Sequence, residues 1–412
     1  MGMVYLDYAA ATPVRKEALD AMLPFFSEDF FNPSSPYLAA KRVREKYENA
    51  KSDLAHTIGA KSADLIVTSG ATEANNLAFT ILHDDLPAFR EATPSDIFLA
   101  TNSPTQPRVL ALTTEHASVR ELVRQYHGDF IKVDKTGLID LADFRARITD
   151  QTELISISLA NNELGIIQPL AEISEIIKKV NQERHKNGNK RKLYLHSDAS
   201  QALNLIEINV ARLGVDLLTL NSPKVYGPKG VGALYIARGT KLTPINRGGG
   251  QELGLRSGTE NVPGVIGFAT AAKLAKAHLS ESRKKYLRLT EILKAELAKA
   301  KITPIFLGNH KHQLTNFCPV SFPGIDAERL IYLLEDQEIY LSTGAACAAS
   351  KGQKSHVLEA IGLSDPEIAG SLRISLGLLN TEENTRLAAQ AITSAVNSER
   401  SEEHTSELQS RI

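Results

Sequence analysis

Residues 193–236 read LYLHSDASQALNLIEINVARLGVDLLTLNSPKVYGPKGVGALYI, and they establish the expected fold class. The stretch holds three short apolar runs, at 193–196, 217–220 and 231–236, separated by polar segments. Short continuous apolar runs are typical of strands that are buried on both faces of a mostly parallel sheet. Polar residues and a lysine follow two of the runs, where the carboxyl ends of strands in α/β folds meet their ligands.

The same pattern extends towards the N-terminus. Further apolar runs rich in β-branched residues occur at 65–68, 109–113, 130–133 and 154–159. Apolar residues at helical spacing between 169 and 180, with Pro169 in the expected first turn, predict a helix with one face on the sheet. We therefore expect an α/β fold with a mostly parallel central sheet and helices on both faces.

The pattern changes beyond about residue 260, where a charged amphipathic helix precedes shorter strand and helix patterns. We predict a large domain over 26–260 and a smaller α+β domain over 261–399, joined in part by the N-terminal segment 1–25. Residues 400–412 are polar and read like an in-frame translation of a sequencing-adapter sequence. We interpret them as a non-native tail, with a disordered native tail as the alternative. The proline-rich segment 83–108 is expected to be a surface excursion.

The composition excludes several classes of protein. The 412 residues are 42% hydrophobic and 23% charged, unlike disordered chains. A net charge of −1 gives no overall attraction to nucleic acid or anionic membranes, and no apolar run approaches the ~18 residues of a membrane span. The only cysteines, Cys318 and Cys347, exclude a disulfide scaffold and favour a cytoplasmic protein with no membrane partner.

One basic stretch, 178–192, carries seven Lys or Arg residues against one acid. It could contact RNA, but it lacks aromatic residues for base stacking and ends a predicted helix, where cations are favourable. We interpret it as a solvated loop and expect no direct contact with nucleic acid.

Four short segments carry candidate chemistry. Residues 68–73 (TSGATE) follow a strand and open a helix, so they form either a phosphate site or a simple helix cap. Asp198, at the end of a strand, is either a cap or a cofactor anchor. Lys224 lies just past a buried strand, where burial would favour a Schiff base, although most such lysines are solvated. Cys347 lies in a loop of small residues. Cys318, by contrast, is part of an alternating strand pattern and is expected in the core.

Taken together, these segments resemble a known family over residues 5 to about 379. The matching strings are LDYAAATP (6–13), NPSS (32–35), SGATEANNLA (69–78), TEHASV (114–119), NNELG (161–165), HSDASQAL (196–203), YGPKGVGALY (226–235), GGGQELGLRSGTEN (248–261), TGAACAAS (343–350) and SLRISLG (371–377). In order and spacing they are similar to the cysteine desulfurases, pyridoxal-phosphate (PLP) enzymes of the class V aminotransferase group. The resemblance implies the type I PLP-transferase fold.

The resemblance also implies cofactor-binding residues. Lys224 would bind PLP covalently, and Asp198 would pair with its pyridinium nitrogen. His116 would stack on the ring and move protons. The remaining cofactor contacts would come from Asn162 and Gln201 at the ring hydroxyl, and from Ala71, Thr72 and the partner subunit's Thr259 at the phosphate.

Two further residues would act on the substrate, L-cysteine. Arg373 would bind the α-carboxylate, with Asn162 beside it, because its planar fork matches a carboxylate. Cys347 would be the nucleophile that takes the sulfur as a persulfide and passes it to an acceptor protein. The long loop around Cys347 resembles the group that supplies iron–sulfur scaffolds and tRNA-thiolation relays. No metal site is expected, and the enzyme is expected to be a homodimer.

The chain departs from the family pattern at three places. The Ser-x-His-x-x-Gly pattern expected after Asn32 and Pro33 is absent. Pro223 stands where the family usually has a histidine, so Asn221, Ser222 or water must supply that phosphate contact. Leu253 replaces a usual arginine. The alternatives to a desulfurase are another class V activity, such as selenocysteine lyase or aminotransferase, and a non-catalytic sulfur-transfer scaffold. Retention of Lys224 and Cys347 argues against both.

Overall fold

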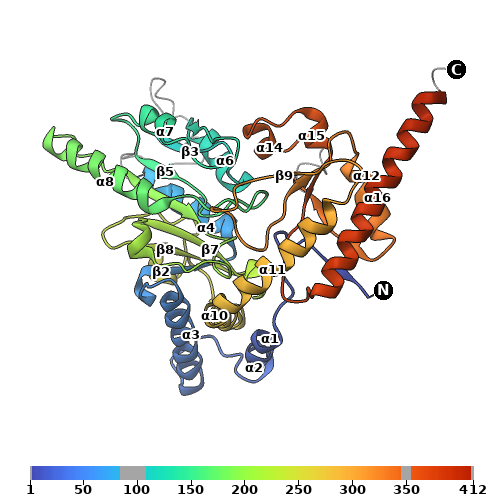
Figure 1. Cartoon of the computed structure of the whole chain (residues 1–412). Coiled ribbons are helices and arrows are strands. Elements are labelled where there is room, and N and C mark those ends of the chain that lie inside the picture. Colours follow the sequence, from blue (N-terminus) through green and yellow to red (C-terminus); the bar gives the residue numbers. More distant parts are fainter. Residues whose placement is uncertain (1, 84–107, 345–353, 410–412) are drawn as a thin grey trace.

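The computed structural model describes residues 2–83, 108–344 and 354–409, with 400–409 as backbone only (Figure 1). Two predictions lie largely outside these ranges. They are the surface excursion at 83–108 and the conformation of the loop that carries Cys347.

A seven-stranded sheet forms the centre of the larger lobe (Figure 1). Its order is β2-β8-β7-β6-β5-β3-β4. The strands are β2 (Leu65–Thr68), β3 (Val109–Leu112), β4 (Asp129–Ile131), β5 (Leu154–Ser156), β6 (Tyr194–Asp198), β7 (Leu217–Asn221) and β8 (Gly232–Ile236). All neighbours are parallel except the two pairs that β8 makes. The predicted mostly parallel α/β fold is therefore confirmed.

Helices cover both faces of this sheet because successive strand residues point to opposite sides. In β3, Val109 and Ala111 pack in one cluster with α4 (Ala71–Phe79) and α6 (Ala117–Gln125). Leu110 and Leu112 belong to the opposite cluster, which includes residues of α8 (Leu170–Lys186). Most strand positions are thus apolar on both sides of the sheet, and the buried polar residues His196 and Thr219, at the centres of β6 and β7, lie 3.1 Å apart through Nε2 and Oγ1.

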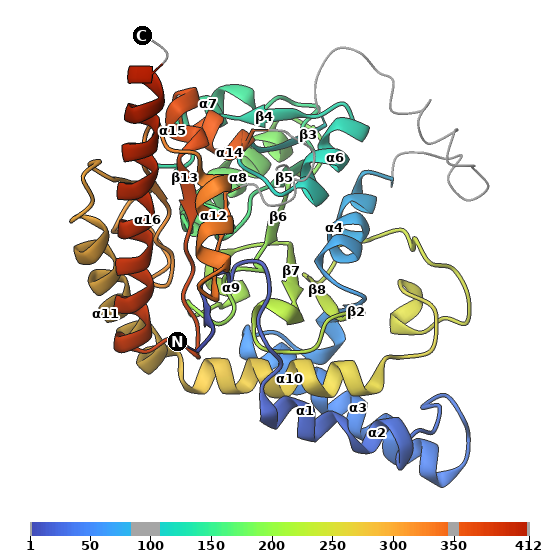
Figure 2. The ribbon, with the colours of Figure 1, turned by 90° about the vertical axis from the view of Figure 1, so that its right-hand side faces the viewer.

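Four helices lie along one edge of the larger lobe (Figure 2). They are α1 (Lys16–Met22), α2 (Pro24–Ser27), α3 (Leu38–Thr57) and α10 (Val262–Ala277). The larger lobe also contains α7 (Leu141–Arg147), α9 (Val210–Leu213) and the 3-10 turns Ser62–Asp64, Thr80–His83, Ser222–Lys224 and Glu252–Gly254.

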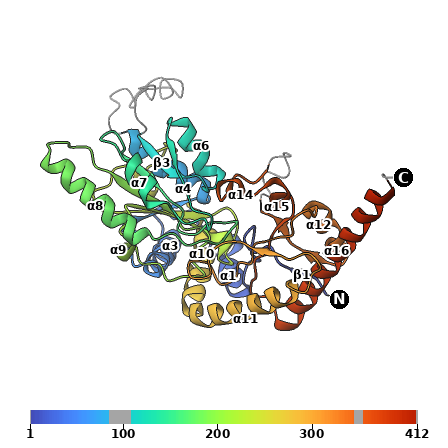
Figure 3. The same cartoon turned by 45° about the horizontal axis from the view of Figure 1, so that its top comes forward.

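The smaller lobe is built on a four-stranded antiparallel sheet of order β12-β13-β10-β9. The strands are β9 (Ile305–Phe306), β10 (Val320–Ser321), β12 (Ser342–Thr343) and β13 (Ser371–Arg373). Its helices are α11 (Leu279–Leu297), α12 (Ala327–Glu335), α14 (His356–Ala360), α15 (Asp365–Ala369) and α16 (Glu382–Gln409). Figure 3 shows α11 and α16 along its outer side. At the N-terminus, β1 (Val4–Tyr5) pairs with β11 (Ile339–Tyr340). The domain boundaries themselves stay predictions.

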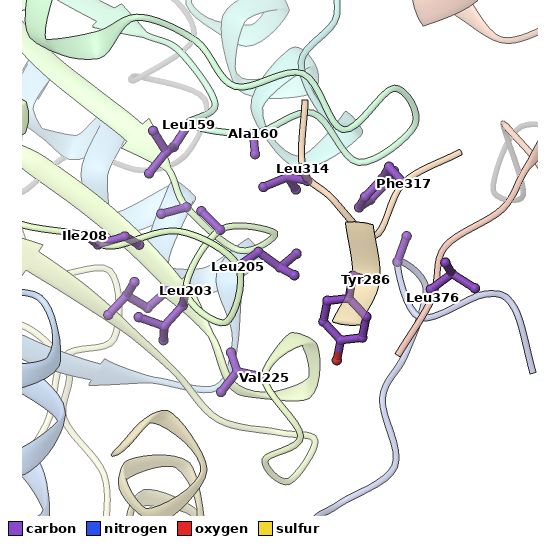
Figure 4. Packing of buried hydrophobic residues seen from close by; sticks show 14 of the residues in the cluster. Leu159, Ala160, Leu203, Leu205, Ile208, Val225, Tyr286, Leu314, Phe317 and Leu376 are labelled. Atoms are coloured by element: carbon purple, nitrogen blue, oxygen red, sulfur yellow. The ribbon is translucent and has the colours of Figure 1, made fainter. Parts of the chain in front are cut away.

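A continuous apolar cluster joins the two lobes (Figure 4). It brings Leu159 and Leu205 of the larger lobe together with Tyr286 of α11 and Phe317 of the smaller lobe. Cys318 belongs to the same cluster and is fully buried, which confirms its predicted place in the core.

The predicted element boundaries differ from the structure in a few places. The α8 helix begins at Leu170, so Pro169 precedes it as the N-cap. The β5 strand ends at Ser156, earlier than predicted, although the N–H groups of Ile157 and Leu159 still donate to backbone carbonyls of β6. The α16 helix continues through Gln409, since nothing in the polar sequence after residue 399 stops it. That residues 400–412 are a non-native tail stays an interpretation. No helix in the described ranges is long and apolar enough to cross a membrane.

Candidate active site

The proposed cofactor lysine lies directly after β7, as the sequence predicts. The Lys224 Nζ donates to the backbone carbonyl oxygen of Ala9 at 2.8 Å and to that of Ala10. The Gln201 side chain donates to the same Ala9 oxygen at 2.9 Å. The N-terminal segment therefore forms one wall of the site and brings Lys224 and Gln201 to a single atom.

The carboxylate of Asp198 ends β6 and is only 8% exposed. Its Oδ2 accepts from the Nδ2 of Asn75 at 2.9 Å, and its Oδ1 accepts from the backbone N–H of Ser200 at 2.9 Å. Sequence reasoning missed Asn75. It lies one turn of α4 beyond Ala71 and Thr72, and this helical spacing was the signal that could have identified it.

A chain of hydrogen bonds connects Asp198 to His116. The second proton of Asn75 Nδ2 is donated to the Ser118 Oγ at 2.9 Å. The Ser118 Oγ lies 2.9 Å from Nδ1 of His116, which also accepts from the Ser118 backbone N–H at 3.2 Å. Because Nδ1 is an acceptor here, the neutral ring carries its proton on Nε2.

His116 is exposed, yet the protein around it changes the pKa of its side chain. Burial against the surrounding protein lowers the pKa of His116, the charge of Asp198 acts in the opposite direction, and Lys224 lowers the pKa further. The influence of both residues on His116 is consistent with one shared site. The neutral form of His116 is therefore favoured near pH 7.

The start of α4 provides the proposed phosphate site. Gly70 precedes the helix, Ala71 and Thr72 form its first turn, and the Thr72 side chain is exposed. The Oδ1 of Asn221 lies 3.7 Å from the position that a Cβ on Gly70 would occupy, so Asn221 lies next to this turn. By contrast, the Ser222 hydroxyl is buried against Gly227, where an added Cβ would approach it to 2.2 Å.

The proposed carboxylate-binding residue, Arg373, is 4% exposed at the end of β13. Its Nη2 donates to Asp7 Oδ1 at 2.7 Å and to Ser342 Oγ at 3.4 Å. Its Nη1 donates to the backbone oxygen of Asn162 at 3.3 Å. The Nε has no acceptor within the described residues, which leaves a donor for a ligand. Burial raises the pKa of Asp7, although the Arg373 charge opposes this shift.

The turn that carries Asn162 is shaped by its neighbour. The Asn161 Oδ1 accepts from the backbone N–H groups of Glu163 and Leu164, both at 2.8 Å. Its Nδ2 donates to the Thr114 carbonyl oxygen at 2.9 Å. The Asn161 amide is thus committed to the backbone, whereas Asn162 lies next to Arg373.

Thr259 is exposed on a loop that is held by two polar anchors. Glu252 accepts from Lys51 Nζ and from the backbone N–H of Val67, both at 2.7 Å. Arg256 donates to Glu73 of α4 at 2.9 Å. The anchors fix the loop while Thr259 faces outwards, as a contact to a partner subunit requires.

Comparison with known proteins agrees with this arrangement. Residues 4–387 match the family described as aminotransferase class-V. The chain belongs to this family. Cysteine desulfurase IscS of Methanosarcina thermophila is 39% identical over 386 residues, which cover 92% of this chain and 89% of that protein.

Two solved structures extend the class V comparison. A NifS-like protein is 30% identical, with a TM-score of 0.83 over 95% of this chain and 99% of that one. SspA in complex with cysteine is 31% identical, with a TM-score of 0.73 over 90% of this chain and 98% of that one. The lobes described above are thus those of class V enzymes.

Cys347 itself lies outside the described residues. The chain on either side of it is described up to Gly344 and again from Lys354. Within the described ranges, no group of three or more His, Cys, Asp or Glu side chains could hold a metal ion.

The basic stretch at 178–192 is largely engaged in local contacts. Its partnered residues are Lys178 with Glu175, Arg184 with the Thr149 carbonyl oxygen, Arg191 with Glu153, and Lys192 with Asp216. These contacts favour its interpretation as a structural surface of the class V fold over a nucleic-acid site.

Proposed function

We propose that this protein is a cysteine desulfurase, which converts L-cysteine to L-alanine and transfers the sulfur to Cys347. The observation that carries the proposal is the hydrogen-bond chain from Asp198 through Asn75 and Ser118 to His116, beside Lys224. Two of the relatives named above supply the substrate class, because one is named a cysteine desulfurase and the other was solved in complex with cysteine.

The residues of the site fit PLP. A buried carboxylate at a strand end suits a pyridinium nitrogen, and the first turn of α4 after Gly70 suits a phosphate. The Oδ1 of Asn75 is buried without a partner in the described residues, so the site has a hydrogen-bond acceptor available to a ligand. Lys224 would hold the cofactor, Asp198 its ring nitrogen, Gln201 and Asn162 its hydroxyl, and Ala71, Thr72 and Asn221 its phosphate. When bound, PLP supplies an electron sink for negative charge at the substrate Cα.

The chain's own residues would do the remaining work. Arg373 binds the substrate carboxylate in a place where water is largely excluded, which strengthens the interaction. Lys224 would be the base that takes the α-proton. His116 holds a proton on Nε2 in its neutral form and can donate it.

Sulfur transfer would use Cys347. Its thiolate attacks the substrate sulfur, a sulfur–sulfur bond forms as the Cβ–S bond breaks, and Cβ takes up a proton to give alanine. The persulfide then passes to an acceptor protein, for which an iron–sulfur scaffold or a tRNA-thiolation relay fits the length of the loop. The cytoplasmic location stays a prediction from cysteine usage.

A homodimer is part of the proposal. Large apolar side chains are exposed near α1 and α2, including Phe26 at 61% and Phe30 at 64% exposure. Leu253, on the loop of Thr259, is 70% exposed. Exposed apolar side chains that recur over neighbouring elements are typical of protein interfaces. Burial of this surface by a second copy would present the partner subunit's Thr259 to the phosphate site.

The test is an assay of the purified protein, with its cofactor content measured by absorbance. Addition of L-cysteine without a reducing agent should yield about one alanine per chain and a persulfide on Cys347, and a thiol reductant should permit turnover. L-Selenocysteine measured in parallel separates a desulfurase from a selenocysteine lyase. Cofactor binding without alanine release would contradict the proposal.

A further inference from the structure

Glu163 is a buried carboxylate that the mechanism above does not use. It is 6% exposed and lies in the turn at 161–165. Its Oε2 accepts from the Ser355 hydroxyl at 2.6 Å. A Cβ added to Gly344 would lie 2.8 Å from the same oxygen, so the Gly344 backbone is close to the carboxylate. One oxygen atom therefore lies at both described ends of the segment that contains Cys347.

The partners of Glu163 are themselves firmly held. Ser355 is the N-cap of α14, and its Oγ accepts from the backbone N–H of Leu358 at 3.2 Å. On the other side, the backbone N–H of Glu163 is bound by Asn161, whose side chain also reaches Thr114. The Ser355–Glu163 hydrogen bond thus connects α14 to the framework of the larger lobe.

The same turn is coupled to the substrate-binding arginine. Arg373 donates to the backbone oxygen of Asn162, the residue before Glu163, and its charge favours the ionised form of Glu163. Burial raises the pKa of Glu163 to about 7, against the Ser355 hydrogen bond and the Arg373 charge, so a fraction of this carboxyl is ionised near neutral pH.

We propose that Glu163 is a positioning residue for sulfur transfer. It fixes both ends of the Cys347 segment relative to the turn that contacts Arg373. The thiol is thereby positioned relative to the substrate. Steps at the substrate Cα depend on Lys224 and His116 and do not require this contact. The inference rests on the proposed desulfurase function.

The experiment separates these two steps in the holoenzyme. Exchange of the α-proton of L-alanine with heavy water reports on the Cα step, and rapid-quench detection of the Cys347 persulfide reports on sulfur transfer. Glu163→Ala and Ser355→Ala should each slow persulfide formation by about 10- to 100-fold, as expected for a misplaced reacting group, and leave exchange within about twofold. Glu163→Gln keeps an oxygen acceptor for Ser355 and should restore most of the rate.

Two further measurements define the role. The double variant Glu163→Ala/Ser355→Ala should be little slower than Glu163→Ala, because the contact between the carboxylate and Ser355 is already absent in the single variant. In the holoenzyme without substrate, alkylation of Cys347 should become several-fold faster in Glu163→Ala. Glu359→Ala, an exposed glutamate on α14, is the matched control and should match wild type in all assays.

Equal losses in exchange and transfer, or no loss in transfer, would overturn the inference. An unchanged alkylation rate in Glu163→Ala would also count against it. If wild type itself exchanges alanine protons but forms no persulfide or alanine from L-cysteine, the proposed function fails instead, and the two failures are thereby distinguished.

Discussion

The two sheets of the molecule position their functional residues in different ways. On the seven-stranded sheet, Asp198 and Asn221 are the last residues of strands that are buried on both faces. On the four-stranded sheet, Arg373 belongs to a strand of three residues and is oriented by Asp7, Ser342 and Asn162, which come from three other segments. Position follows from strand register in the first case and from contacts between distant segments in the second.

This difference corresponds to a division of labour. In the proposed mechanism the larger lobe holds the cofactor and performs the proton transfers at Cα. The smaller lobe binds the substrate carboxylate and carries the thiol. Variants in the two lobes should therefore impair different steps of the reaction, and to different extents.

The largest effect is expected from Lys224→Ala, on the side of the larger sheet. Loss of the amine removes both the covalent attachment of PLP and the proposed base, so turnover should fall by roughly a thousandfold or more. The absorbance of the bound cofactor should also change. Lys229→Ala, on the exposed Gly/Pro turn, is the control and should retain activity. A Lys224→Ala enzyme with substantial turnover would assign the chemistry elsewhere.

Cys347→Ser tests the same division of labour in the smaller lobe. Hydroxyl is a poor nucleophile toward sulfur, so sulfide and alanine formation from L-cysteine should fall by roughly a hundredfold or more. Cofactor absorbance and proton exchange at Cα of L-alanine should remain near wild type. Loss of both steps would show that the two lobes do not divide the reaction.

Arg373→Lys should produce a smaller, substrate-binding defect. The lysine keeps the charge but loses the planar fork, so the KM for L-cysteine should rise by about tenfold while kcat changes less. Steady-state kinetics measure this split. Arg386→Lys, in a half-exposed ion pair with Glu296, should leave both parameters unchanged. A fall in kcat alone would contradict a binding role.

The smallest effect on activity is expected at Glu115, where the change is in the pH dependence of the free energy of unfolding. Glu115 is 1% exposed and accepts from the backbone N–H and hydroxyl of Ser158, and burial raises its pKa to about 8. The folded form therefore retains a proton that the unfolded chain releases above its ordinary pKa of 4.5. This contribution makes the free energy of unfolding fall as pH rises from about 4.5 to 8.

Glu115→Gln should flatten that dependence by on the order of 2 kcal/mol between pH 5 and 8, measured by denaturant unfolding. Glu121→Gln, an exposed glutamate on the following helix, should keep the wild-type slope. Identical slopes in all three proteins would show that Glu115 is ionised in the folded state throughout this range.

The sequence predicted the fold and one side of the site better than the other. All seven strands of the large sheet were expected, and Lys224 and Asp198 were candidates from their places just after apolar runs, whereas their roles were implied by the family resemblance. Their partners were not found. Asn75 contacts Asp198 across 123 residues, Glu163 contacts Ser355 across 192, and Arg373 contacts Asp7 across 366. Periodicity reports local burial, whereas a polar contact between distant segments depends on how the packed elements meet.

The buried position of Cys318 has a practical consequence for the study of sulfur in this protein. Its side chain is fully enclosed, and burial raises its thiol pKa to about 12, so it contributes almost no thiolate at neutral pH. Of the two cysteines in the sequence, Cys318 is thus excluded as a reactive thiol in the folded protein. In the proposed reaction, sulfur retained under native conditions would therefore be assigned by mass to Cys347, with no cysteine removed by mutagenesis.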